Sequence, residues 1–395
     1  MKICYFVGHF PYQDYFYNFS KYKSNYHYDG GISVAYNLAL NMAKINHDVT
    51  VCTTSARWKN EFEQYMGISI HRYGTNFRLA SGNFSINLFL NPPKKDFDII
   101  HTHVGNPIAD LAGYTYAKRN KGTPFIITYH GDGSENLSSG IRNFCVKFHN
   151  KYLLDKILSR ADLIISPSMN YIDVSKFLKK HKKKIIAIPN GVDLKNFQLT
   201  YSKIQCRRRL GLSHDDKVIL FVGAISPHKG PDLLLKAMPT ILRKVHNVKL
   251  IIIGKGVMEE KIKQLSRQLG IDKQIEFVGF IADTFRKAMY YNAADIFVLP
   301  SFLELSPQVI LEAMASGLPI VATNVGGIPD LVEDEKCGLL IPAGDCLALE
   351  NAVIYLLENG TIRDKMRQRE LEKIKDFSWE SMAKITEKIY SEILS

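Results

Sequence analysis

Two glutamates, Glu304 and Glu312, are the residues whose type and spacing most clearly suggest chemistry, and seven residues separate them. An apolar strand pattern ends at Leu299, and a helical pattern begins near Pro307, a residue that suits the first turn of a helix. Glu304 is therefore expected in the loop before the helix and Glu312 within it. Spacing alone is equally compatible with two solvated glutamates on an ordinary helix.

The start of such a helix could bind an anion. Its first-turn amides have no partner inside the helix, and they lie at the positive end of the helix dipole, which suits a diphosphate. A carboxylate deeper in the same helix could accept hydrogen bonds from sugar hydroxyls, as acidic residues do with ribose in nucleotide-binding folds. A helix start of this kind, with a carboxylate deeper in the helix, would suit a ligand that carries both a diphosphate and a sugar.

The elements that must position these residues follow a regular rhythm. Short apolar runs rich in β-branched residues alternate with longer amphipathic segments, which is typical of parallel sheets covered on both faces by helices. Strands are expected at residues 3–7, 49–53, 68–73, 99–103, 125–130, 163–166, 185–188, 218–222, 249–253, 275–278, 296–299 and 320–322. The predicted fold class is α/β, with two doubly wound, Rossmann-like domains.

The boundary between the domains is expected at the turn Pro189-Asn190-Gly191, after which residues 193–216 read as an irregular polar stretch. We predict an N-terminal domain over 1–190, a C-terminal domain over 191–377 and a final amphipathic helix over 378–395. Ligands of open α/β sheets bind outside the carboxyl ends of the strands. Two such sheets facing each other therefore predict a site in the cleft between the domains.

Further motifs accompany the two glutamates along almost the whole chain. They are Gly30-Gly31, Asp98–His103, Thr128–Gly131, Ile188–Asp193, Lys229-Gly230, Gly254–Gly256, Asp295–Ser301, Glu312–Pro319 and Val325–Pro329. In their order and spacing, the motifs together resemble the retaining glycosyltransferases of the two-Rossmann-domain (GT-B) type, specifically the large family 4. The resemblance implies that the final helix crosses back onto the N-terminal domain.

The resemblance also implies roles for the matching residues. Glu312 is expected to hold the ribose of a nucleoside-diphosphate sugar. Lys229 is expected to neutralise the diphosphate, and Glu304 to lie by the sugar and its leaving phosphate. His130, expected beside the donor sugar, completes a catalytic set with Glu304 and Lys229. The other expected donor-binding residues are Gly31, Gly223, Gly254, Ser306, Gln308 and Val309. The expected acceptor-side residues are Gly30, Tyr12 and His103.

Two departures from the family's pattern affect the donor site. Ala224 stands where the family usually has an arginine, so one phosphate-binding cation is missing, and His228 is the nearest candidate to replace it. After Glu304 the family often has a glycine-aromatic-glycine run, whereas this chain has Leu305-Ser306-Pro307, and Pro307 offers no N–H. The sugar pocket is therefore expected to differ from that of typical members.

The charge is unevenly distributed along the 395 residues. The chain has 51 Lys and Arg against 39 Asp and Glu, a net of +12, and residues 1–190 carry +11 of it. This asymmetry suggests an anionic partner for the first half, such as an anionic acceptor or a membrane surface.

Two local features of the first half allow more than one interpretation. The six lysines within 176–184 could contact anionic lipid or simply form a solvated helix end. The aromatic residues crowded into 10–28 could stack on an acceptor sugar, lie at a membrane interface, or pack on themselves.

Several other classes of function are poorly supported. Gly254-Lys255-Gly256 is not continued as G-x-G-x-x-G and no Walker A sequence is present, which argues against dehydrogenases and P-loop NTPases. Asp96-Phe97-Asp98 is a literal D-x-D, but it opens a strand in a fold that is expected to need no metal. No nucleic-acid-binding module is recognisable. Scattered cysteines, and the lack of a signal-peptide core or an apolar run of spanning length, favour a cytoplasmic protein that could lie on the inner face of the cell membrane.

The predicted function is that of a retaining glycosyltransferase. It would move a sugar from a UDP-, GDP- or ADP-sugar to a glycan or lipid-linked acceptor, with no cofactor and no metal. The acceptor is expected on the N-terminal domain and the donor on the C-terminal domain. Two alternatives stay open: a UDP-sugar 2-epimerase-like enzyme of the same fold, and a non-catalytic protein that binds nucleotide sugars.

Overall fold

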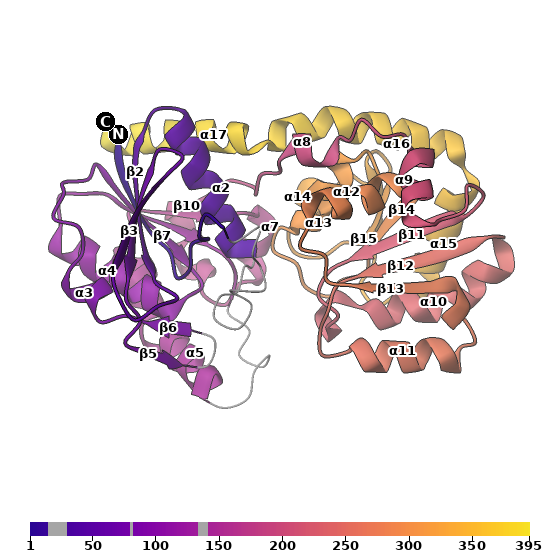
Figure 1. Cartoon of the computed structure of the whole chain (residues 1–395), viewed down its shortest axis with the longest axis horizontal. Helices are drawn as coiled ribbons and strands as arrows, with labels where there is room; N and C mark the ends of the chain where they lie inside the picture. The colour runs from indigo at the N-terminus through magenta and orange to yellow at the C-terminus, as the bar shows by residue number, and fades with distance from the viewer. Residues whose placement is uncertain (15–29, 80–81, 133–140) are drawn as a thin grey trace. The chain divides into compact units, whose positions relative to one another are not determined.

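The structure, a computed structural model, describes residues 1–14, 30–79, 82–132 and 141–395. The chain forms two compact units (Figure 1). Unit 1 contains Met1–Asn190 together with Trp379–Ser395, and unit 2 contains Gly191–Ser378. The aromatic segment 10–28 lies largely outside the described residues.

Unit 1 is built on an eight-stranded sheet in the order β10-β9-β8-β7-β1-β2-β4-β3. Its strands are β1 Lys2–Phe6, β2 Asp48–Thr54, β3 Glu61–Tyr65, β4 Ile68–Tyr73, β7 Ile99–Val104, β8 Phe125–Tyr129, β9 Leu163–Ser166 and β10 Ile185–Ala187. All neighbouring strands are parallel except β3, which pairs antiparallel with β4 at the edge. The short strands β5 Phe77–Leu79 and β6 Gly82–Phe84 form a separate antiparallel pair.

The last helix of the chain packs into unit 1. The helices of unit 1 are α2 Gly30–Lys44, α3 Asn87–Leu90, α4 Pro107–Arg119, α5 Ile141–Tyr152, α6 Leu154–Arg160, α7 Met169–Val174 and α17 Trp379–Leu394, with the 3-10 helix η1 Leu178–Lys184. Helix α17 lies beside α2, and its buried residues Trp379, Met382 and Tyr390 join the core of this unit (Figure 1). The Tyr390 hydroxyl lies 3.1 Å from that of Tyr5 on the central strand β1.

Unit 2 is built on a six-stranded parallel sheet in the order β13-β12-β11-β14-β15-β16. Its strands are β11 Lys217–Val222, β12 Val248–Ile253, β13 Ile275–Gly279, β14 Ile296–Leu299, β15 Ile320–Thr323 and β16 Gly338–Ile341. Its helices are α8 Leu194–Phe197, α9 Lys203–Leu210, η2 Pro227–Lys229, α10 Pro231–Lys244, α11 Glu259–Gln268, η3 Asp272–Gln274, α12 Thr284–Ala293, α13 Gln308–Ala315, α14 Ile328–Leu331, α15 Cys346–Glu358, α16 Gly360–Lys373 and η4 Ile374–Phe377. The predicted α/β class with two parallel Rossmann-like sheets is confirmed.

The sequence-based prediction for residues 193–216 was wrong, because this stretch is not irregular. It contains α8 and α9, and Ser202 starts α9 with a capping box in which the Gln205 side chain binds back to the Ser202 amide. Arg207 of α9 is buried, and its guanidinium lies 2.7 Å from a carboxylate oxygen of Asp295. The helix was missed because its polar residues make long-range ion pairs instead of displaying an apolar stripe.

Helix α16 buries an acid, Glu370, that makes no hydrogen bond among the described residues. Glu370 is fully buried, and neither of its carboxylate oxygens has a hydrogen-bond partner among the described residues. Burial raises the pKa of this carboxyl well above its ordinary value. The folded protein therefore keeps a proton on Glu370 at a pH where the unfolded chain has lost it, and the free energy of unfolding falls as the pH rises above the unfolded value of 4.5.

We expect Glu370→Met to stabilise unit 2 by about 1–3 kcal/mol near pH 7, because it removes an unsatisfied buried polar group at similar volume. The gain should grow from pH 5 to pH 8. Chemical denaturation followed by circular dichroism measures it, since both tryptophans, Trp58 and Trp379, lie in unit 1. Parallel stability curves for the two proteins across this pH range would contradict the expectation.

Candidate active site

The candidate site of unit 2 lies where the strand order reverses. Strands β11 and β14 are neighbours in the sheet, although β12 and β13 come between them in the chain. The loops that leave their carboxyl ends therefore run side by side, and the Phe302 amide donates to the His228 carbonyl at 2.7 Å. Such a switch point is where open α/β sheets bind ligands.

Glu304 and Lys229 meet at this point as an ion pair. Lys229 Nζ lies 2.6 Å from Glu304 Oε1, and the Ser301 hydroxyl donates to the same oxygen at 2.7 Å. The Glu304 side chain is only 5% exposed, whereas that of Lys229 is 19% exposed and still reaches the surface. An ammonium group has three N–H donors, so Lys229 can keep Glu304 and also bind an anion.

Two glycines hold the Glu304 loop from the next loop of the sheet. Gly326 has φ +51°, and a Cβ at this position would lie 1.8 Å from the Glu304 carbonyl oxygen. The Gly327 amide donates to that same carbonyl at 3.2 Å. The backbone of residues 325–329 thus holds the Glu304 backbone in place, which explains why glycines are needed in this motif.

Glu312 is held inside unit 2 by helix α12. Its Oε1 accepts from Lys287 Nζ at 2.5 Å, and its Oε2 accepts from the Tyr291 hydroxyl at 2.9 Å. Burial raises the pKa of Tyr291 well above its ordinary value, with the nearby Glu312 carboxylate adding to the effect, so Tyr291 stays a donor. Each carboxylate oxygen has a second lone pair, which leaves Glu312 able to accept from a ligand's hydroxyls.

Helix α13 begins with amides that have no recorded acceptor in the part of the chain that the structure describes. Pro307 precedes it and gives no side-chain cap, and among the described residues no acceptor binds the Gln308 and Val309 amides. The Gln308 side-chain nitrogen is also buried without a partner there, while Ser306 is buried beside it at 8% exposure. These donors can bind a ligand's oxygens.

The loops after β11 and β12 are tightly joined at the same sheet edge. The Gly223 amide donates to Ile253 at 3.0 Å, and a Cβ on Gly254, whose φ is +149°, would lie 1.8 Å from the Gly223 carbonyl oxygen. Only a glycine fits at position 254. The two glycines therefore allow the backbones of the two loops to lie in close contact at the switch point.

A second group of polar residues lies at the carboxyl ends of β7 and β8 in unit 1. His103 Nδ1 is 2.9 Å from His130 Nε2, and their rings stack with centroids 5.2 Å apart. Burial lowers the pKa of His130 to about 4 and that of His103 well below its ordinary value. Both imidazoles are therefore neutral near pH 7. Neutral rings can donate or accept hydrogen bonds but add no positive charge.

The remaining predicted residues of unit 1 are not gathered around these histidines by any contact that the structure records. Gly30 and Gly31 begin α2; Gly30 is exposed, and a Cβ there would meet no atom of the described residues within 4 Å. Tyr12 is buried at 6% exposure, and the guanidinium carbon of Arg72 lies 3.8 Å from its ring centroid. The Tyr12 hydroxyl binds Ser55 and Glu61. Its expected contact with an acceptor stays a prediction, and Arg72 would have to move to free the ring.

Neither Ala224 nor His228 adds a positive charge to that of Lys229 for binding a diphosphate. Ala224 carries no charge, and burial together with the Lys229 charge lowers the pKa of His228 below its ordinary value. His228 is therefore neutral near pH 7 and cannot replace the charge of the missing arginine.

The D-x-D motif of unit 1 has a structural contact at Asp98, whose carboxylate accepts a hydrogen bond from the Lys2 amide at 2.7 Å. No cluster of three or more His, Cys, Asp or Glu that could hold a metal is found among the described residues.

Several residues that contact the predicted site residues were given no role from the sequence, although Ser301, His101 and Thr128 lie within the motifs named there. They are Ser301 beside Glu304, Lys287 and Tyr291 beside Glu312, and His101, Thr128 and Tyr390 behind His103. Lys287 and Tyr291 are four residues apart on the helix before β14, a spacing that places two side chains on one helix face. For Lys287 and Tyr291, that spacing was the one local feature of the sequence that could have placed them together.

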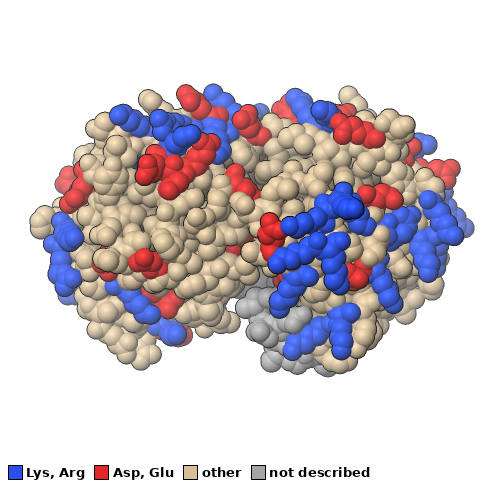
Figure 2. Space-filling view, turned by 180° about the vertical axis from the view of Figure 1, so that it is seen from behind, with Lys and Arg blue, Asp and Glu red and all other residues tan. Residues whose placement is uncertain are grey.

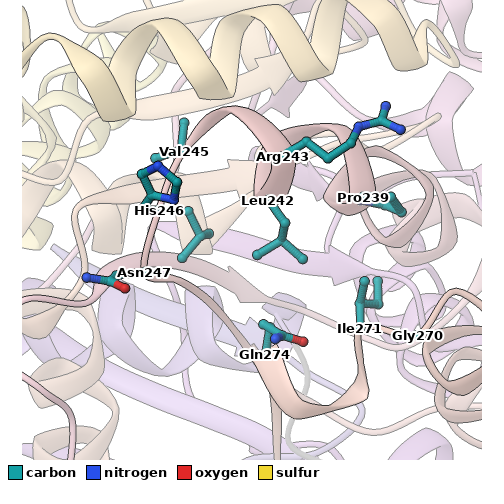
Figure 3. A pocket seen from close by; sticks show the side chains of 10 residues that line it. Pro239, Leu242, Arg243, Val245, His246, Asn247, Gly270, Ile271 and Gln274 are labelled. Carbon is teal, nitrogen blue, oxygen red and sulfur yellow. The ribbon is translucent and has the colours of Figure 1, made fainter.

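A pocket of about 510 Å³ lies elsewhere in unit 2 (Figure 3). Its lining comes from the end of α10, the start of β12 and the segment before β13, and includes Leu242, His246 and Gln274. It therefore lies at the amino end of β12, whereas Lys229, Glu304 and the glycine loops lie at the carboxyl ends of the strands. The lining of this pocket also includes Arg243, but the pocket lies at the opposite end of the strands from the switch point, where open α/β sheets bind ligands.

The folds of solved glycosyltransferases match the whole chain. A sucrose-phosphate synthase from Thermosynechococcus elongatus superposes with a TM-score of 0.74 at 23% identity, covering 100% of this chain and 99% of that one. Anabaena HepE in complex with UDP-glucose superposes with a TM-score of 0.72 at 18% identity, covering 99% of this chain and 100% of that one. The fold is therefore that of the GT-B glycosyltransferases.

The sequence comparisons give the family. Residues 28–196 match the model "Glycosyltransferase Family 4", and residues 202–373 match "Glycosyl transferases group 1". A D-inositol 3-phosphate glycosyltransferase of Catenulispora acidiphila is 30% identical over 306 residues, which cover 75% of this chain and 70% of that protein. An uncharacterized glycosyltransferase of Methanocaldococcus jannaschii is 34% identical over 236 residues, 56% of this chain and 60% of that protein. The chain belongs to the family 4, group 1 glycosyltransferases and is a glycosyltransferase.

Proposed function

We propose that this enzyme transfers a sugar from a nucleoside-diphosphate sugar to a glycan or lipid-linked acceptor, with retention of anomeric configuration and without a metal ion. The observation that carries the proposal is the Lys229–Glu304 pair, at 2.6 Å, at the switch point of unit 2, together with the first amides of α13, for which the described residues supply no acceptor. Both features suit a diphosphate. The related Anabaena structure in complex with UDP-glucose supports a nucleotide-sugar donor.

The proposed step breaks the bond between the anomeric carbon and the diphosphate oxygen, and forms a bond from that carbon to an acceptor oxygen on the same face. The acceptor's proton passes to the departing phosphate. Negative charge builds on the leaving group, where Lys229 and the amides of Gln308 and Val309 stabilise it. Glu304 holds the Lys229 ammonium in place and lies by the sugar; it is not a covalent nucleophile in this scheme.

The other proposed contacts are divided between the two units. Glu312 accepts hydrogen bonds from the ribose, and Gly223 and Gly254 leave room for the nucleotide in unit 2. In unit 1, His130 binds the transferred sugar, and Gly31 at the start of α2 approaches the donor. Gly30 and Tyr12 are proposed for the acceptor side, and His103 contributes there through its contact with His130.

A panel of UDP-, GDP- and ADP-sugars, incubated with and without a membrane-lipid extract and with and without EDTA, tests the function. We expect one donor to lose its sugar to an extracted acceptor, in EDTA as well, and NMR of the product should show the donor's anomeric configuration. Conversion of a UDP-sugar without acceptor would instead indicate an epimerase. Nucleotide binding without turnover of any donor would indicate a binding protein.

The excess positive charge of unit 1 is concentrated in one segment. Residues 141–184 contain eleven Lys and Arg but only three Asp, a net of +8, out of +11 for residues 1–190. Figure 2 shows basic side chains gathered on one part of the surface, at the right of the view. This segment contains α5, α6 and η1, and Asp155 of α6 binds Lys180 and His181 of η1. Asp155 therefore holds basic residues of η1 against α6, and we call the described lysines and arginines of 147–184 the basic surface.

Helix α5 adds exposed aromatic residues to this surface. Phe144, Phe148 and Tyr152 are 70%, 49% and 49% exposed and lie four residues apart, so they form one stripe beside Lys147 and Lys151. Exposed aromatics flanked by lysines suit the interface of an anionic bilayer. None of the described helices is long and apolar enough to cross a membrane. We propose that α5 and the basic surface hold the enzyme on the cytoplasmic face of an anionic membrane.

Co-sedimentation with vesicles of phosphatidylcholine, with or without 30 mol% (about one lipid in three) of an anionic phospholipid, tests this surface. We expect binding to the anionic vesicles only, weakened by salt. The double variant Phe144→Ser/Phe148→Ser should reduce it about tenfold, since each ring loses its apolar burial in the interface. Phe62→Ser is the matched control, because Phe62 is 60% exposed on β3. Equal binding to both kinds of vesicle, or an equal loss in the control, would contradict the proposal.

A further inference from the structure

The contact between His103 and His130 joins two nitrogen atoms that cannot both donate. His103 Nδ1 and His130 Nε2 are 2.9 Å apart, and both rings are neutral near pH 7 because they are buried. A neutral imidazole carries one N–H and one lone pair. One ring must therefore donate and the other accept, and the choice decides which nitrogen of each ring carries its proton.

The second nitrogen of His103 discriminates between the two arrangements. His103 is 4% exposed, and its Nε2 is buried with no hydrogen-bond partner among the described residues. If His130 donated, His103 would carry its proton on this Nε2, leaving a buried N–H unsatisfied. If His103 donates from Nδ1, only a lone pair is left unpaired, and buried orphan donors are the rarer and costlier case. The burial of Nε2 therefore favours His103 as the donor.

We propose that His103 is a positioning residue that donates from Nδ1 to His130 Nε2 and so holds His130 with its proton on Nδ1. His130 then offers a neutral N–H donor, and among the described residues nothing hydrogen-bonds to that Nδ1. The functional part of this inference rests on the proposed function, in which the Nδ1–H of His130 donates to an oxygen of the transferred sugar. The tautomer itself does not depend on that function.

The packing behind His103 explains how its ring is kept in place. The His101 ring stacks on it with centroids 4.8 Å apart and planes 14° apart. His101 is held at both nitrogens, by the Tyr390 hydroxyl at 2.5 Å and by Thr128 Oγ1 at 2.8 Å. Tyr390 comes from the last helix of the chain, α17. The C-terminal helix thus supports, through His101 and His103, the orientation of His130.

The tautomer of His130 can be read directly by long-range ¹H–¹⁵N correlation NMR on the full chain labelled with ¹⁵N-histidine. Comparison with the spectra of His130→Gln and His103→Asn assigns the two rings. We expect protonated nitrogen at His130 Nδ1 and His103 Nδ1, and unprotonated nitrogen at both Nε2 atoms. A proton on His130 Nε2 in the unmodified protein would overturn the proposal, whether or not any sugar is transferred.

Two variants connect the tautomer to catalysis. His103→Leu removes the donor, so His130 should lose its single tautomer, and kcat should fall about tenfold, the contribution of one hydrogen bond, with little change in the donor KM. His103→Asn places an amide N–H near the position of Nδ1 and should restore both the NMR pattern and most of kcat. Circular dichroism checks that each variant folds. Equal losses in the two folded variants, or a native His130 tautomer in His103→Leu, would contradict the role of His103.

Discussion

Replacement of Lys229 by methionine is expected to lower kcat for sugar transfer by about 100-fold to 1,000-fold, the range seen when a preorganised donor to a developing oxyanion is removed. The expected loss is large because neither Ala224 nor His228 supplies a second positive charge for the leaving diphosphate. Ala224 replaces the family's usual arginine, and His228 beside it is neutral near pH 7. The donor KM should rise less than kcat falls, because the charge on the leaving diphosphate is greatest in the transition state.

A matched variant separates this effect from the loss of any salt bridge. Lys373 is 20% exposed and binds Glu333 at 2.8 Å, so it resembles Lys229, which is 19% exposed and binds Glu304 at 2.6 Å. We expect Lys373→Met to keep kcat within about twofold of the unmodified enzyme, because Lys373 belongs to a surface ion pair that has no part in the proposed donor contacts. Steady-state kinetics with the donor found in the panel gives both values. An active Lys229→Met enzyme would show that the diphosphate is stabilised elsewhere.

Replacement of Glu312 by glutamine is expected to raise the donor KM by about 100-fold. In the proposed complex the carboxylate accepts from the ribose hydroxyls, and hydrogen bonds to a charged group contribute about 1.5–3 kcal/mol each. The matching change in the substrate is a 2′-deoxy nucleotide sugar. The unmodified enzyme should strongly prefer the ribose donor, and Glu312→Gln should lose most of that preference, because the two changes remove the same contact.

Tyr291→Phe controls for the packing around Glu312. It removes the 2.9 Å hydrogen bond to Glu312 Oε2 but leaves the carboxylate and its ion pair with Lys287. We expect its donor KM to rise less than tenfold and its ribose preference to persist. If Glu312→Gln kept the full preference for ribose, Glu312 would be a structural partner of Lys287 and not a nucleotide ligand.

Much of the fold was predictable because buried parallel strands are nearly continuous apolar runs. The expected strand 68–73 matches β4, and 296–299 matches β14. Strand β3, Glu61–Tyr65, was missed because it is an antiparallel edge strand with alternating exposure and polar residues. Residues 141–160 form two helices, α5 and α6, which meet at Leu153.

The site was only partly predictable, for a related reason. Lys229 and Glu304 could be located by their motifs, but their contact joins residues 75 positions apart and depends on the switch in strand order between β11 and β14. Tyr390 is 289 positions from His101, its partner. Contacts of this range leave no periodic trace in a sequence, because they are set by how the elements pack.

The central claim is that unit 2 binds the diphosphate of a nucleotide sugar through Lys229 and the start of α13. Calorimetric titration of the unmodified enzyme with UDP, GDP and ADP, and then with the corresponding monophosphates, tests it most directly. We predict that one nucleoside diphosphate binds at least about tenfold more tightly than its monophosphate, the effect of added charge-assisted hydrogen bonds, and that Lys229→Met removes most of this difference. If no nucleoside diphosphate binds, or if the diphosphate and the monophosphate bind equally well, the claim is wrong.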